Sequence, residues 1–336
     1  MAVKPAPAAV LKSIAVAPDT VKLVGRRAEQ GLVVTGKYSD GTERDLTQKA
    51  KFQVSSPAVV AVTPDESRRV VRPRGDGSAD VTVTVTGAPP AVARVQVAQM
   101  DATIPVSFRD EVVPALTKAG CSMGTCHGTP TGKGGLRLSL QGYAPELDYA
   151  AIVGEGGGRR VNRADPGRSL LLLKPLLEVA HAGGKRLTPE MPEFEVLYRW
   201  IAEGLRDDPE DKPKLVRVDV LPGRRTLKLP GARQQIAAQA YFSDGSVRDV
   251  TRVAKLTTSD EDAATVTREG LVEGQKRGDV AVLVRYQDVL QSQRITFLKD
   301  VPGFKWSNPP VENFIDREVF QRLKLFQIPV SDLAPD

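Results

Sequence analysis

Cys121, Cys126 and His127 are the side chains of this sequence whose types and spacing could do chemistry. A histidine directly after a cysteine is the arrangement that ligates haem iron once two thiols have added to the porphyrin. The usual spacing is Cys-x-x-Cys-His, whereas four residues separate the two cysteines here. Gly124 lies in this longer linker and makes an outward bulge sterically easy. We therefore expect one haem c, attached through Cys121 and Cys126, with His127 as its proximal iron ligand.

Other interpretations of this motif stay open. Two cysteines this close in sequence could form a local disulfide or remain free thiols. A zinc ion could also use both sulfurs and the adjacent imidazole, although the sequence offers no obvious fourth ligand nearby.

The second axial position of the iron has two candidate ligands, with an open or water-filled site as the third option. His181 lies in a glycine-containing loop, and Met191 lies just before the last helical pattern of this segment. Two histidine ligands would give a lower reduction potential than a histidine and a methionine, because a thioether favours reduced iron. Arg159 and Arg160 are candidates to pair with the haem propionates through charge-assisted hydrogen bonds.

Short amphipathic helices are expected to position these residues. Apolar residues recur at helical spacing over residues 106–118 and again over 193–203, and a compact apolar run covers 169–177. Glycine clusters separate these patterns. The sequence therefore predicts a small all-α domain over residues 104–207.

Residues 104–206 resemble the planctomycete-type cytochrome c domains, in which the motif Gly-Cys-x4-Cys-His-Gly is familiar. Here the motif runs from Gly120 to Gly128, and further matching pieces are Gly135–Leu140, Gly158–Val161, Ser169–Pro175 and Leu197–Gly204. The resemblance implies an extracytoplasmic haem protein. It also favours His181 over Met191 as the distal ligand, because the loop from His181 to Arg186 matches the family's His-x-Gly-Gly-x-Arg pattern.

An internal repeat flanks this segment. Ser39-Asp40-Gly41 and Asp45-Leu46-Thr47 recur as Ser243-Asp244-Gly245 and Asp249-Val250-Thr251, at a constant offset of 204 residues. The Asp-Gly pairs predict turns between strands, and the later alternating apolar runs are typical of sandwich strands. Both copies resemble group-2 bacterial Ig-like domains, which implies two all-β sandwiches over residues 10–99 and 214–298 that flank the all-α domain.

Composition excludes some broad classes. The net charge is +6, but 47 basic and 41 acidic residues are interleaved along the chain, so an electrostatic footprint for nucleic acid is absent. No apolar run reaches the roughly 20 residues that cross a bilayer. The start of the sequence has no signal-peptide pattern, and the haem prediction favours a leader that has been removed and a periplasmic or other extracytoplasmic location.

The last segment, residues 309–336, carries an apolar helical stripe and is expected to open a further C-terminal domain of the same protein. Two functions follow from these patterns. The first is a single-haem electron-transfer module, not an enzyme in itself, that meets an unidentified redox partner protein and uses its Ig-like domains as spacers or docking surfaces. The alternative is a non-redox adhesion or carbohydrate-binding scaffold stapled by a Cys121–Cys126 disulfide.

Overall fold

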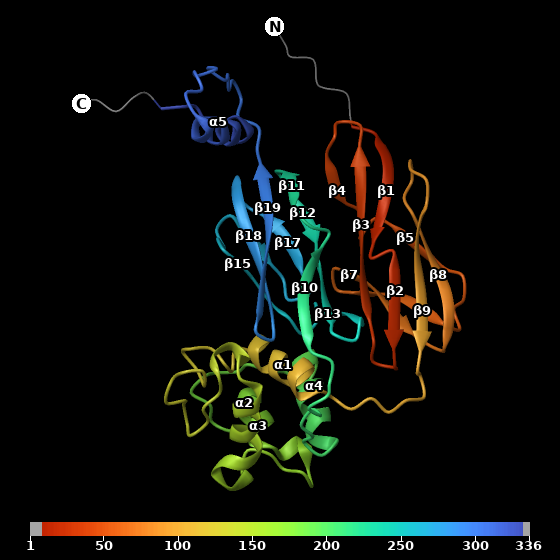
Figure 1. Cartoon of the computed structure of the whole chain (residues 1–336), viewed down its shortest axis with the longest axis vertical. Coiled ribbons are helices and arrows are strands. Elements are labelled where there is room, and N and C mark those ends of the chain that lie inside the picture. The colour runs from red at the N-terminus through yellow and green to blue at the C-terminus, as the bar shows by residue number, and fades with distance from the viewer. Residues whose placement is uncertain (1–8, 332–336) are drawn as a thin grey trace, which may run out of the picture.

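The computed structural model describes residues 9–331. The first eight residues and the last five residues of the predicted C-terminal segment lie outside this range. Two β-sandwiches lie side by side with their long strands roughly parallel, and a small loop-rich module is attached to one end of the second sandwich (Figure 1). The helix α5 (Phe314–Phe326) lies at the opposite end of that sandwich.

The first sandwich contains two sheets. One sheet has the strand order β1-β3-β7-β6, with β4 also paired to β3, and the other has the order β2-β9-β8-β5. Every second residue of β9 is buried, as expected of a strand with one face on the core. The strands are β1 (Leu11–Ala17), β2 (Thr20–Val24), β3 (Gln30–Tyr38), β4 (Glu43–Asp45), β5 (Lys51–Val54), β6 (Val60–Asp65), β7 (Arg68–Pro73), β8 (Gly77–Thr84) and β9 (Ala91–Ala98).

The second sandwich repeats this topology. Its strands pair as β11-β19-β18-β15 on one side and as β10-β13-β14 and β12-β17-β16 on the other, so that β12 and β13 together replace β3. Val16 pairs with Val34 in the first copy, and Val220 pairs with Ala238 in the second, so the 204-residue offset holds in space. The strands are β10 (Leu215–Leu221), β11 (Arg225–Lys228), β12 (Arg233–Gln235), β13 (Ala237–Phe242), β14 (Val247–Asp249), β15 (Lys255–Thr258), β16 (Ala264–Val266), β17 (Leu271–Gly274), β18 (Gly278–Tyr286) and β19 (Val289–Leu298).

The module between the sandwiches has short helices and long irregular stretches. Its α-helices are α1 (Val113–Lys118), α2 (Pro145–Tyr149), α3 (Leu170–Leu176) and α4 (Pro192–Ala202), and a π-helical turn, Phe108–Val112, precedes α1. The apolar patterns therefore predicted three helices correctly. Phe108 joins the ends of the module, because its ring lies 5.1 Å from that of Trp200 and 5.2 Å from that of Tyr149.

The prediction of an all-α domain in this region is wrong. The longest of its helices, α4, has 11 residues, and no α-helix forms between α1 and α2 or between α3 and α4. Glycines supply the reason: Gly132, Gly134 and Gly135 have φ values of +66°, +59° and +74°, which end a right-handed helix. The described chain is thus mostly β-sandwich with few helices. None of its described helices is long and apolar enough to cross a membrane.

Candidate functional site

The cysteine motif forms a tight loop directly after α1. The amide of Cys121 donates to the carbonyl of Leu116 at 2.9 Å and ends the helix. The amide of His127 donates to the carbonyl of Cys121 at 3.0 Å, which closes the loop back on its start. Gly128 has no room for a side chain, because a Cβ there would lie 2.2 Å from the carbonyl oxygen of Ser122. The motif is therefore a compact turn fixed by backbone hydrogen bonds.

The two cysteines of this turn are free thiols. Burial raises the pKa of Cys121 to about 12, and the neighbouring sulfur of Cys126 acts in the same direction. A thiol with such a pKa stays protonated at neutral pH and is a poor nucleophile, because the thiolate is the reactive form. The disulfide of the alternative interpretation is not formed in this structure.

His127 and His181 lie together, although 53 residues stand between them in the sequence. Their rings are nearly parallel, with an interplanar angle of 12° and centroids 6.3 Å apart. Nδ1 of His127 lies 3.0 Å from the carbonyl oxygen of Lys133, and Nδ1 of His181 lies 2.8 Å from that of Gly184. Burial lowers the pKa of His127, and the nearby imidazole of His181 lowers it further.

The other predicted site residues are arranged differently. Arg160 is buried, and its Nη1 donates to the carbonyls of Ala151 and Glu155 at 2.6 and 2.7 Å, so it holds a loop in place. Arg159 is exposed. Met191 packs against the apolar core of the module. Cofactor binding stays a prediction for Cys121, Cys126, His127, Arg159 and Arg160. Metal binding stays a prediction for His127 and His181, with Met191 as the alternative.

Sequence patterns missed the contact that attaches the module to the second sandwich. Nζ of Lys118, at the end of α1, donates to the carbonyls of Thr251, Arg252 and Arg268 at 3.2, 2.8 and 2.9 Å. Burial lowers the pKa of this lysine to about 8. The nearby carboxylate of Glu193 opposes that shift and forms an ion pair with Arg268 at 2.5 Å.

Asp110 is a second anchor in the same contact. Its carboxylate pairs with Lys212 at 2.8 Å and with Arg248 at 3.0 Å, and it accepts a hydrogen bond from Gln287 at 2.9 Å. Its backbone carbonyl accepts from the buried hydroxyl of Tyr286 at 3.0 Å. A lone lysine and a lone aspartate on an amphipathic pattern gave no sequence signal for this role, because their partners come from residues more than 100 positions away.

The two sandwiches contact each other through equivalent residues of the repeat. Oδ2 of Asp249 accepts from the amide of Gly31, and Oδ2 of Asp45 accepts from the amide of Gln235. Because 31 and 235, like 45 and 249, differ by 204, the interface has approximate two-fold symmetry, as in an isologous dimer. The other oxygen of each carboxylate accepts from the amide of the threonine two residues later, which keeps both aspartates oriented.

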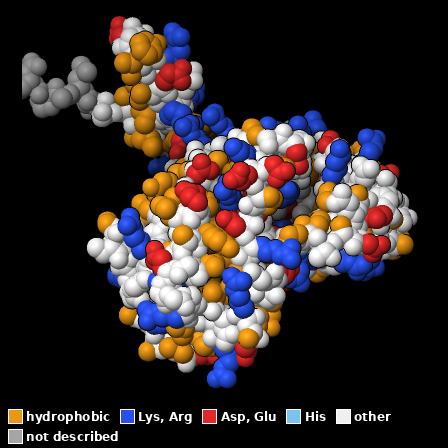
Figure 2. Space-filling model, turned by 60° about the horizontal axis from the view of Figure 1, so that its bottom comes forward, with side chains coloured by type: hydrophobic (Ala, Val, Ile, Leu, Met, Phe, Trp, Pro, Cys, Tyr) orange, Lys and Arg blue, Asp and Glu red, His pale blue; other side chains and the backbone are white. Residues whose placement is uncertain are grey.

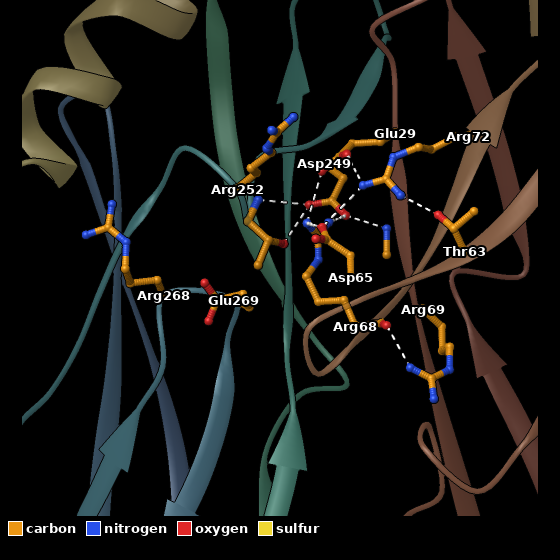
Figure 3. Close-up of polar contacts among 12 residues, drawn as sticks. Glu29, Thr63, Asp65, Arg68, Arg69, Arg72, Asp249, Arg252, Arg268 and Glu269 are labelled. Carbon is orange, nitrogen blue, oxygen red and sulfur yellow. Dashed lines mark hydrogen bonds and ion pairs between the residues drawn. The ribbon is translucent and has the colours of Figure 1, made fainter. Parts of the chain in front are cut away.

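An arginine breaks this symmetry and strengthens one half of the interface. Arg68 of the first sandwich pairs with Asp249 and with Glu29, both at 3.0 Å, and with Asp65 at 3.3 Å. The side chains of Arg68 and Asp249 are 3% and 0% exposed. Figure 3 shows Asp249 of one sandwich pointing into this group of charges from the other. Such a buried, multiply bonded pair fixes the relative position of the two sandwiches.

Comparisons with known proteins assign no family to the chain. No family model matches it, and no curated protein matches it. Domains 5–6 of the S-layer protein SbsC align over 86% of this chain and 99% of that one, with 12% identity and a TM-score of 0.34. SbsC domains 1–6 align over 81% of this chain, with 11% identity and a TM-score of 0.23, and here the chain spans only 23% of the other protein. The Yersinia pseudotuberculosis adhesin InvE aligns with 11% identity and a TM-score of 0.17, over 85% of this chain and 58% of its own. Similarities at this level assign neither the fold nor the function.

These findings contradict the prediction of a planctomycete-type cytochrome c domain with a covalent haem c on Cys121 and Cys126. In the described residues, no three or more His, Cys, Asp or Glu side chains gather where they could hold a metal ion. The surrounding segment is a loop-rich module with short helices and not an all-α domain. The predictions of iron binding and of electron transfer through that iron depended on the haem, so they are wrong as well. Adjacent residues of one short motif were a weak basis for predicting a haem domain, because their adjacency in the sequence does not determine the fold around them.

Proposed function

We propose that this chain is a non-redox scaffold of an extracytoplasmic protein, in which two Ig-like sandwiches form one rigid body that holds the loop-rich module in a fixed orientation. The observation that carries the proposal is the reciprocal pair of contacts made by Asp45 and Asp249. An interface built from equivalent residues of both copies, with the buried pair of Arg68 and Asp249 in it, restricts the motion of one sandwich relative to the other.

The attachment of the module supports the same function. It reaches the second sandwich through Lys118 and Asp110, and it reaches the first through an ion pair between Arg27 and Glu111 at 2.6 Å. Three-way contact of this kind restricts the motion of all three parts. Over the face shown in Figure 2, acidic and basic side chains are interleaved, which suits a protein that stays soluble without a strong charge preference in its partners.

The extracytoplasmic location is part of the proposal. The neighbours named above are described as S-layer and adhesin proteins. A scaffold of this kind acts through the geometry of its domains and needs no catalytic group. Adhesion is the form of this function that fits a chain with paired Ig-like domains.

Small-angle X-ray scattering of the full chain tests the rigidity. We expect the wild-type curve to match a single arrangement of the two sandwiches and the module. Replacing Asp45 and Asp249 together by alanine should increase the radius of gyration and populate separated sandwiches. The matched control replaces Asp40 and Asp244, which are exposed equivalents in the Ser-Asp-Gly turns, and should leave the curve unchanged. A wild-type curve that needs many separated arrangements would contradict the proposal.

A further inference from the structure

We propose that residues 138–144 form a pH-responsive latch segment of the module, which the carboxyl group of Asp148 holds closed in acid and loosens as the pH rises. Asp148 lies in α2 and is buried, with 2% of the residue exposed. Its Oδ1 accepts a hydrogen bond from the amide of Ser139, and its Oδ2 lies 2.8 Å from the hydroxyl oxygen of the same serine. That hydroxyl also accepts from the amide of Ala144 at 3.0 Å, so one carboxyl group holds both ends of the segment.

The latch segment supports the cysteine turn and reaches the second sandwich. The amide of Leu138 donates to the carbonyl of His127 at 2.8 Å, and the amide of Gln141 donates to the carbonyl of Ser122 at 2.9 Å. Oε1 of Gln141 accepts a hydrogen bond from Nζ of Lys255 in β15 at 3.4 Å. Loosening the latch segment would therefore release the cysteine turn from one of its supports.

The backbone of the latch segment needs outside restraint. Gln141 has a φ of +57°, in the left-handed region that residues other than glycine rarely adopt. Gly142 follows with a φ of +76°, and a Cβ there would lie 2.4 Å from Cγ1 of Val113 in α1. Such a conformation persists only where surrounding contacts hold it in place. The hydrogen bonds between Asp148 and the segment supply part of that restraint.

The surroundings of Asp148 disfavour its charged form. Its contacts are the neutral amide and hydroxyl of Ser139. Burial raises the pKa of Asp148 to about 6, and the like charge of Glu146 on the same helix acts in the same direction. The two hydrogen bonds from Ser139 oppose this shift without cancelling it.

Other titratable groups near Asp148 are exposed or have partners elsewhere. Of the two nearby phenols, Tyr143 is exposed, and the hydroxyl of Tyr149 donates to the carbonyl of Leu205 at 2.8 Å. On the elements packed around α2 and the latch segment, the charged groups are the exposed Arg109 and four residues with the partners described above, namely Asp110, Glu111, Lys118 and Lys255. Asp148 is therefore the group whose titration acts on the latch segment.

The sign of the effect follows from proton linkage. The pKa of Asp148 is about 6 while the segment is closed, whereas the ordinary pKa of an aspartate is 3.8. The closed form binds the proton more tightly, so closure is strongest in acid and weakens as the pH rises from 3.8 to 6. The difference corresponds to roughly a hundredfold change in the closing equilibrium. In acid, the protonated Oδ2 donates to the hydroxyl of Ser139, so the contact itself is kept.

Hydrogen–deuterium exchange of the full chain, resolved by residue with NMR, tests the latch. Rates are corrected for the intrinsic pH dependence of exchange. We expect the amides of Ser139, Gln141 and Ala144 to lose at least tenfold in protection between pH 4.5 and pH 7.5. Amides within α4 are the internal control and should keep their protection over the same range.

Asp148→Asn separates this effect from any other titration. The asparagine stays neutral and can make both contacts with Ser139, so the three amides should be strongly protected at both pH values. Glu146→Gln changes an exposed position of the same helix and should keep the pH dependence of the wild type. Should the asparagine variant fail to fold, carbon-13 NMR titration of the Asp148 carboxyl in the wild type decides, with a midpoint near 6 expected.

Three results would overturn the inference. They are equal protection of the three amides at both pH values in the wild type, a carboxyl midpoint at or below the ordinary 3.8, and a pH dependence that persists in Asp148→Asn. The scaffold function would survive each of them, since it is measured by scattering.

Discussion

Asp45 and Asp249 make equivalent contacts across the interface between the sandwiches, because each accepts a hydrogen bond from a backbone amide of the opposite copy. The motif Asp-x-Thr recurs in both copies because it does two tasks. One carboxylate oxygen orients the turn through the following threonine, and the other oxygen joins the partner sandwich. The repeated segment that predicted a hairpin in each copy therefore also forms the contact that fixes the two sandwiches relative to each other.

Asp249→Ala should cost about 3–5 kcal/mol of unfolding free energy, because it leaves the buried guanidinium of Arg68 without its closest partner in the second sandwich. Urea denaturation followed by circular dichroism measures the change. Asp244→Ala, five residues earlier in an exposed turn, is the control and should leave the transition where it is. Equal transitions for the two variants would show that the Arg68–Asp249 pair does not hold the sandwiches together.

The free energy of unfolding should depend on pH through the titration of Lys118. Its pKa is about 8 in the folded chain, whereas the ordinary pKa of a lysine is 10.5, so between these two values the unfolded chain binds more protons. Stability attributable to this group therefore rises with pH from about 8 to 10.5, by up to about 1.4 kcal/mol per pH unit. Below pH 8 the group is charged in both states and its contribution is constant.

Comparison of the wild type with Lys118→Met isolates this effect. The difference in unfolding free energy between the two proteins should change over pH 8–10.5 and be flat below pH 8. Lys51→Met, at an exposed position of β5, should run parallel to the wild type throughout. Parallel curves for Lys118→Met as well would mean that the lysine titrates normally and is not buried against the second sandwich.

His127 should titrate below its usual pKa of 6.5, because burial and the adjacent ring of His181 both disfavour its charged form. The chain has only two histidines, so NMR titration of their ring protons resolves each one. His181→Ala should move the pKa of His127 upward by removing the second cause. Since the folded pKa is lowered, stability from this group is lost as the pH falls below 6.5. A wild-type His127 that titrates at or above 6.5 would contradict the ring contact.

The sequence predicted the sandwiches because their signals are local. Asp40 and Asp244 mark hairpins through turn chemistry, and the alternation in β9 reports a strand with one buried face. The same local signals predicted helices near 106–118 and 193–203. These signals wrongly predicted that the whole module is α-helical. Glycines such as Gly132 adopt positive φ values that interrupt helices, and the spacing of apolar residues does not reveal those φ values.

The candidate sites were harder to predict because they depend on distant residues. His127 and His181 were singled out from the sequence, and the structure does bring them together. Nothing in the sequence near Arg68 or Lys118 indicates that their partners belong to the second sandwich.

The visible absorption spectrum tests the central claim, that this is a non-redox scaffold, most directly. The full chain would be produced in an extracytoplasmic compartment of a host that has the haem-attachment machinery, and purified without added cofactor. The account predicts a colourless protein whose mass is that of the polypeptide alone, 36.2 kDa. A Soret band with an added mass on Cys121 and Cys126 would contradict it.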